Sequence, residues 1–236
     1  MFIEQIQCNL VKSPEFPFGL GSVHDLMGKG LVLKSPVTIL TGENGVGKST
    51  LLEAVAEAMG LDSRGGHGGR RYRNSTPTSR LAEELIVLPH ANRNRADTFF
   101  LRAETALGVW TYMSEMGVKG YGSGRSLAEM SHGESVLDVL RGRFDTPGLY
   151  LLDEPEAGLS FSSMLVLAAV LTRIGRSGGQ VICATHSPVL CFVEGSSVFE
   201  LDSDGIHPRQ AHQIKLIEEW ECFFARPAEF MREVLK

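Results

Sequence analysis

Apolar residues along this chain come in short runs that predict strands alternating with helices. The runs at residues 37–41, 149–152 and 180–184 are compact and mostly apolar, as buried parallel strands are. Apolar residues also recur at helical spacing at residues 51–59 and again at 164–171. This alternation predicts an α/β fold in which helices pack on a sheet with buried parallel strands.

Weaker patterns predict the remaining elements. Residues 2–10 alternate between apolar and polar side chains, which favours an edge strand, and residues 31–33 form a second short strand. The other predictions are a buried strand with a polar turn at 99–104, a helix at 110–116, a helix capped by Ser131, a helix capped by Ser160 or Ser162, a strand at 198–201, a turn at 202–205 and a helix around 216–223. Ser131 and Glu134 have the spacing of a capping box, which alone indicates only a well-capped helix.

One glycine-rich stretch stands between the first buried strand and the helix at 51–59. It reads Gly42-Glu43-Asn44-Gly45-Val46-Gly47-Lys48-Ser49-Thr50 and has the form G-x-x-x-x-G-K-[ST]. Its glycines let the backbone wrap a phosphate chain, and the helix N-terminus attracts the negative charge. Lys48 is expected to reach the β- and γ-phosphates, and the Ser49 hydroxyl to ligate Mg²⁺. A chance match in a glycine-rich turn is the alternative, but the flanking strand and helix favour nucleotide binding.

Polar residues also follow the other two buried strands. Asp153 and Glu154 end the run at 149–152, where Asp153 can hold Mg²⁺ and Glu154 can polarise an attacking water molecule. His186 follows the run at 180–184, so the same sheet edge would place it near a γ-phosphate. The sequence therefore predicts a site for hydrolysis of a nucleoside triphosphate.

Composition narrows the setting of this activity. The longest apolar run, residues 164–171, is too short to span a bilayer, and residues 1–5 lack the form of a signal peptide. We therefore expect a cytoplasmic protein without direct membrane insertion. Its four cysteines show no C-x-x-C pairing and are predicted to be small buried residues.

A local excess of arginine contrasts with the net charge of −5. Residues 61–102 carry eight arginines and four acids, a formal charge of 8 − 4 = +4. Arginine suits bidentate phosphate contacts, so nucleic acid could bind through Arg64, Arg70, Arg71 and Arg73. A solvated, flexible loop is an equally good interpretation of this segment.

Two aromatic residues precede the phosphate loop. Phe16 and Phe18 lie next to Pro14 and Pro17, and either could stack on an adenine ring. Aromatic residues between prolines more often anchor a loop to the core, and that interpretation is favoured here.

Taken in order, the four motifs resemble those of ATP-binding cassette (ABC) ATPases. The similarity covers nearly the whole chain and is greatest to small stand-alone bacterial AAA-family/ABC-like ATPases, which are themselves similar to the cassette heads of DNA-repair ATPases. Gly42 to Thr50, the Phe100–Glu104 segment, Ser-His-Gly-Glu from Ser131 and Asp-Glu-Pro-Glu-Ala from Asp153 carry it. The resemblance implies a P-loop NTPase with a mixed sheet and a small helical subdomain.

The resemblance also implies roles for single residues. The implied nucleotide-binding residues are Gly42, Glu43, Asn44, Gly45, Val46, Gly47, Lys48, Ser49, Thr50, Ser131 and Gly133. Ser49 and Asp153 would hold Mg²⁺, while Glu154, His186 and Lys48 would act in catalysis. Ser131 and Gly133 would meet the γ-phosphate bound by a second copy, so that ATP is sandwiched in a homodimer.

Some positions depart from the family pattern. His132 and Glu134 replace residues common in transporters, and Glu104 stands where a glutamine that contacts Mg²⁺ is usual. Ser160 stands near the position of an aspartate that contacts the second subunit. These departures leave a Mg²⁺ role for Glu104 as a weak prediction.

The resemblance finally implies one ABC-type domain over residues 1–236. Its core would be about 1–60 and 148–236, with an inserted arm and helical signature subdomain at about 61–147. The protein would bind and hydrolyse ATP and drive conformational change in a partner, such as a membrane permease or a nuclease. The alternatives are a nucleic-acid-associated ATPase related to DNA-repair heads, or the ATP-binding subunit of a membrane transporter.

Overall fold

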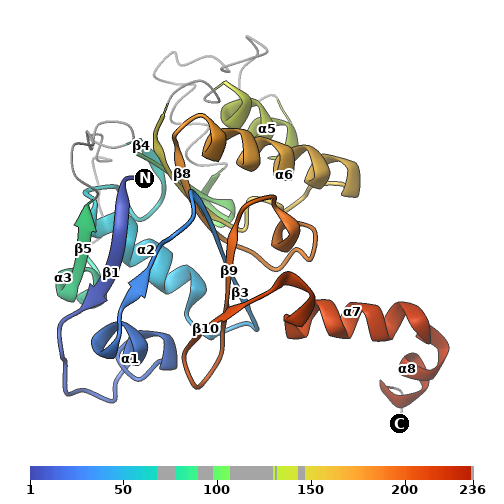
Figure 1. Ribbon diagram of the computed structural model, residues 1–236, viewed down its shortest axis with the longest axis horizontal. Helices are drawn as coiled ribbons and strands as arrows, with labels where there is room; N and C mark the ends of the chain where they lie inside the picture. Colours follow the sequence, from blue (N-terminus) through green and yellow to red (C-terminus); the bar gives the residue numbers. More distant parts are fainter. Residues whose placement is uncertain (68–77, 90–97, 107–129, 131, 143–146, 235–236) are drawn as a thin grey trace.

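The computed structural model describes residues 1–67, 78–89, 98–106, 130, 132–142 and 147–234 of the 236-residue chain. Within these residues the chain forms two sheets with helices packed around them (Figure 1). The predicted helix at 110–116, the Ser131 cap and the arginines at 70, 71 and 73 lie outside the described residues.

The larger sheet has seven strands in the order β10-β9-β3-β8-β7-β6-β4. They are β3 (Val37–Gly42), β4 (Gly66–His67), β6 (Thr98–Arg102), β7 (Leu149–Asp153), β8 (Gln180–Ala184), β9 (Ser197–Leu201) and β10 (Ile206–Arg209). The strands from β9 to β6 pair in parallel, whereas β4 and β10 pair antiparallel at the two edges. The sheet is therefore mixed, as expected, and the carboxyl ends of β3, β7 and β8 lie at one edge.

The smaller sheet is antiparallel, with the order β2-β1-β5. It consists of β1 (Ile3–Cys8), β2 (Leu31–Val32) and β5 (Leu85–Pro89). Because β2 and β5 pair with opposite sides of β1, the prediction of an edge strand at residues 2–10 is wrong. The alternation of apolar and polar residues instead reflects a sheet with one buried and one more exposed face. A central strand of such a sheet alternates as clearly as an edge strand does.

Part of the predicted insertion at 61–147 belongs to these sheets. β5 pairs with β1, and β6 lies between β7 and β4 in the larger sheet. Gly66 and His67, which were predicted to lie in a flexible loop, form the edge strand β4. The strands of this region therefore help to build the body of the fold, and a separate helical subdomain remains a prediction for the rest.

Helices cover both faces of the larger sheet. α5 (His132–Arg141) and α6 (Phe161–Arg176) pack with Tyr150 and Leu152 of β7. α2 (Lys48–Ala58) packs on the opposite face, with Leu149 and Leu151. α1 (Gly21–Gly28) and α3 (Arg80–Glu84) share this second core with the smaller sheet. Alternate residues of one strand therefore serve two hydrophobic cores.

The C-terminal part holds two elements that differ from expectation. The turn at 202–205 leads into β10, which the sequence patterns did not predict. Two helices follow, α7 (Lys215–Ala225) and α8 (Pro227–Val234), and they extend sideways from the body (Figure 1). Cys222 on α7 is exposed, so the prediction of buried cysteines is confirmed only for Cys8, Cys183 and Cys191.

Several of the described helices expose apolar side chains. Leu165, predicted on the apolar face of α6, is instead half exposed. None of these helices combines the length and the apolar character that a bilayer crossing requires.

One buried side chain joins the two sheets. Gln180, the first residue of β8, is fully buried. Its Oε1 accepts hydrogen bonds from the backbone N–H of Phe2 at 2.5 Å and of Ile3 at 2.7 Å. Its Nε2 donates to the Ile3 carbonyl oxygen at 2.9 Å. The amide thus ties the start of β1 to the start of β8.

We expect Gln180→Leu to lower the free energy of unfolding by about 2–4 kcal/mol, because it leaves buried backbone groups of Phe2 and Ile3 without these partners. Gln7→Leu, at a half-buried position of β1, is the control and should cost less than about 1 kcal/mol. Urea denaturation measures both. Equal losses in the two variants would contradict a linking role for Gln180.

Candidate functional site

The phosphate-binding loop joins β3 to α2, and its shape requires glycine. Gly42 and Gly47 have φ angles of +138° and +97°, which residues with a side chain rarely adopt. A Cβ at Gly42 would also lie 2.1 Å from the carbonyl oxygen of Leu201 on β9. Two independent constraints, backbone conformation and the close approach of β9, therefore fix glycine at position 42.

Lys48 begins α2, and its side chain turns back over the loop. Its Nζ donates hydrogen bonds to the carbonyl oxygens of Gly42 and Glu43, both at 2.8 Å. The side chain is buried, and burial lowers the pKa of Lys48 against the opposing effect of nearby carboxylates. The ammonium is therefore held by two neutral carbonyl groups, which an entering phosphate can replace.

Ser49 of α2 and Asp153 of β7 contact each other through their side chains. The Ser49 hydroxyl donates to Asp153 Oδ1 at 2.9 Å. Asp153 is 5% exposed, and burial raises the pKa of its carboxyl group. Both oxygens are ligands that Mg²⁺ accepts in proteins, where phosphate and water complete the coordination. The described residues contain no cluster of three acidic, histidine or cysteine side chains suited to a metal.

Arg102 is a charged neighbour of this pair that the sequence analysis did not single out. It is the register partner of Asp153 in the pairing of β6 with β7. Its guanidinium group lies 3.6 Å from Asp153, 3.2 Å from Glu53 on α2 and 3.1 Å from Glu104. Glu104 is largely exposed and pairs with Arg102, so its Mg²⁺ role stays a prediction.

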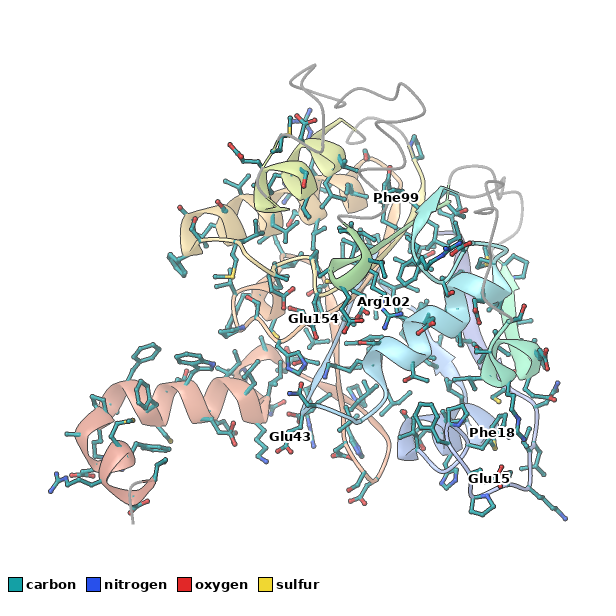
Figure 2. The ribbon with its side chains drawn as sticks, turned by 180° about the vertical axis from the view of Figure 1, so that it is seen from behind. Glu15, Phe18, Glu43, Phe99, Arg102 and Glu154 are labelled. Atoms are coloured by element: carbon teal, nitrogen blue, oxygen red, sulfur yellow. The ribbon has the colours of Figure 1, made fainter. Side chains whose placement is uncertain are left out.

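Glu154 and His186 face each other at the same edge. Glu154 has a positive φ of 51°, and its N–H donates to the Ala184 carbonyl oxygen at the end of β8. His186 Nε2 lies 3.7 Å from Glu154 Oε1. Burial and then the charge of Lys48 lower the pKa of His186, which favours the neutral form of its imidazole. Figure 2 labels Glu154, which directly follows β7, together with Arg102 of β6 and Glu43 of the phosphate loop.

Glu156 holds the segment that carries His186. Its Oε1 accepts hydrogen bonds from the Thr185 hydroxyl and, at 2.8 Å, from the His186 backbone N–H. Burial raises the pKa of Glu156, and its buried Oε2 has no hydrogen-bond partner among the described residues. The sequence signal for this role was a second acid two residues after Glu154, separated from it by Pro155.

A cavity of about 910 Å³ opens beside the phosphate loop. Its lining includes Glu43, Asn44, His186, Glu200 and the first turn of α7. Lys215 at the start of α7 forms an ion pair with Glu43, which lowers the pKa of Glu43 and raises that of Lys215. The first turn of α7 thus lines the candidate site, which no sequence motif indicated.

Other predicted residues have different positions. Phe18 is buried, with the Arg80 guanidinium carbon 5.3 Å from its ring centroid, so it anchors its loop to the core. Phe16 is 70% exposed. Arg64 forms a two-contact pair with the buried Asp62 at 3.0 and 3.2 Å. Gly133 lies in the first turn of α5, while Ser131 is outside the described residues.

Comparisons with known proteins match both halves of the chain. A family model described as "AAA domain" matches residues 19–102. One described as "AAA domain, putative AbiEii toxin, Type IV TA system" matches residues 117–191. Together these models include the phosphate loop and the strand that ends in Asp153 and Glu154.

Sequence relatives are ABC proteins. The Fe(3+) ions import ATP-binding protein FbpC of Streptomyces coelicolor is 30% identical over 225 residues, which cover 90% of this chain and 62% of that protein. The ABC transporter G family member 2 of Dictyostelium discoideum is 28% identical over 189 residues, 67% of this chain and 13% of that protein. The chain thus spans less than two thirds of either relative, and neither comparison supports a nucleic acid or a nuclease as partner.

A solved structure shares the fold. CbiO1 from Clostridium perfringens, part of the ABC transporter complex cbiONQ, superimposes with a TM-score of 0.51 at 16% identity, over 98% of this chain and 96% of that one. Its low identity makes this a similarity of fold alone. In its sequence relatives, its AAA-domain matches and the residues of its phosphate-loop edge, this chain is similar to ABC-type ATPases.

Proposed function

We propose that two copies of this chain enclose two ATP molecules, hydrolyse them and thereby change the conformation of a partner protein. The convergence of Lys48, Ser49, Asp153, Glu154 and His186 on one sheet edge carries this proposal. Gly133 supports the dimer, because it lies in the first turn of α5 and helix N-termini attract phosphate. The second copy would present this helix end to the γ-phosphate.

In the proposed mechanism, Lys48 exchanges its two carbonyl partners for phosphate oxygens. Ser49 and Asp153 would hold Mg²⁺, which would supply positive charge to the β- and γ-phosphates. Glu154 would orient the attacking water and accept its proton, since its carboxylate is half exposed at the end of β7. Neutral His186 would contact the γ-phosphate while remaining beside Glu154.

The name of one relative supports a class of partner. FbpC is by its name the ATP-binding protein of an importer. We propose that this chain likewise acts with a membrane permease, from the cytoplasmic side where ATP is available. The ATP-driven approach of two copies would then be the movement passed to the permease.

We expect Glu154→Gln to bind ATP normally, to hydrolyse it roughly 100-fold more slowly or worse, and to accumulate as a dimer, because the general base is lost while the fold is kept. Steady-state ATPase assays and size-exclusion chromatography with ATP and Mg²⁺ measure these effects. Glu194→Gln, which alters an exposed ion pair with Arg176, is the matched control. A protein that stays monomeric with ATP in both variants would refute the sandwich dimer.

Glu156 provides a separate prediction because it holds His186 without lying next to it in sequence. Glu156→Ala should lower kcat by about tenfold with the KM for ATP changed less than about threefold, since a small displacement of a catalytic group is costly. Glu156→Gln should retain most activity, because its amide oxygen can still accept both hydrogen bonds. A change in KM alone, with kcat intact, would exclude this positioning role.

A further inference from the structure

The C-terminal arm, defined as α7 and α8 (residues 215–234), carries apolar surface that the body does not cover. Trp220, Phe224 and Phe230 are 42%, 69% and 41% exposed, and Met231 and Val234 are exposed as well. Among its described residues α8 has none that is buried. Exposed apolar patches of this kind mark interaction sites.

The aromatic rings of the arm pack against one another. The rings of Trp220 and Phe224 stack with centroids 5.2 Å apart, and Phe230 of α8 meets Phe223 of α7 edge-on at 6.1 Å. The same stripe of α7 begins in the core, where Ile217 is buried. One face of α7 therefore begins in the protein core and continues as an apolar surface exposed to solvent.

The root of the arm is fixed at the nucleotide site. The Lys215 backbone N–H donates to Glu200 Oε1 at 2.9 Å, and its ammonium pairs with Glu43 of the phosphate loop. Glu200 Oε2 also accepts from Arg209 Nε at 3.2 Å. The cavity beside the loop is lined partly by Leu216 and Glu219 of the arm. The arm thus starts at the rim of the ATP site.

We propose that the arm is a second contact surface for the other copy of this chain, and that it clasps this copy when ATP closes the dimer. The inference rests on the proposed function, since a copy seated over the phosphate loop must also meet the rim where α7 begins. Figure 1 shows α7 leaving the body after β10 and extending away from it. In a twofold dimer both arms make the same contact.

The size of this surface is adequate for a specific contact. Aromatic side chains bury about 150–250 Å² each, so the exposed residues of two arms offer on the order of 1,000 Å² in total. Specific protein interfaces begin at about this area. The arms would therefore add substantially to the smaller contacts made through the nucleotides.

The test uses the full chain with Glu154→Gln to hold ATP in the dimer. The arm variant adds Trp220→Ser and Phe224→Ser. The control variant adds Leu10→Ser and Val32→Ser, which are 75% and 43% exposed and belong to the smaller-sheet region. Sedimentation velocity with ATP and Mg²⁺ gives the dimer dissociation constant of each, and ATP binding at low protein concentration verifies that each monomer is folded.

We expect the arm variant to raise the dimer dissociation constant at least tenfold, with ATP binding by the monomer unchanged, while the control stays within twofold of Glu154→Gln alone. An arm variant within twofold would overturn the proposal and assign the arm to a different protein, with the ATP sandwich intact. An equal loss in arm and control variants would also overturn it. If Glu154→Gln itself remains monomeric, the proposed function fails first.

Discussion

The site depends on charged side chains that the end of a parallel sheet holds partly out of water. Burying a charge is costly unless a partner compensates it. Each group here has such a partner: Lys48 has two carbonyl oxygens, Asp153 has the Ser49 hydroxyl and Arg102, and Glu156 has Thr185 and the His186 backbone. These pairings fix the geometry of the edge.

The same pairings prepare the edge for its ligands. Burial lowers the pKa of Lys48 and raises that of Asp153, so it disfavours the charged form of both. A bound phosphate favours the charged lysine, and a bound divalent cation favours the charged aspartate. Nucleotide and metal together would therefore relieve two unfavourable burials at once. Arg102 offers Asp153 a positive neighbour without either ligand, which lowers the cost of the free site.

Sequence reasoning placed at one sheet edge those parts of the candidate site that are continuous in the chain. The phosphate loop, the Asp153–Glu154 strand end and His186 could be predicted because each motif joins a buried strand to a polar residue, and parallel strands share one edge. Contacts that the sheet register creates could not be predicted. Arg102 reaches Asp153 only because β6 pairs with β7 residue for residue. Lys215 reaches Glu43 across 172 positions of sequence.

The fold shows the same division between local pattern and tertiary context. Apolar runs predicted that the strands exist, but they did not predict the central place of β1 in its sheet. Alternation of apolar and polar residues shows that one face is buried, and it does not show how many strands pair with β1. The amphipathic spacing of residues 216–223 likewise predicted a helix. It did not show that the apolar face of this helix extends beyond the hydrophobic core. The apolar stripe of α7 begins at buried Ile217 and ends at exposed Phe224. Exposure of its outer part to water is unfavourable unless another surface covers it. The start of α7 is fixed to the phosphate loop. Association with a second copy would therefore cover the outer part of the stripe and close the nucleotide site in one step.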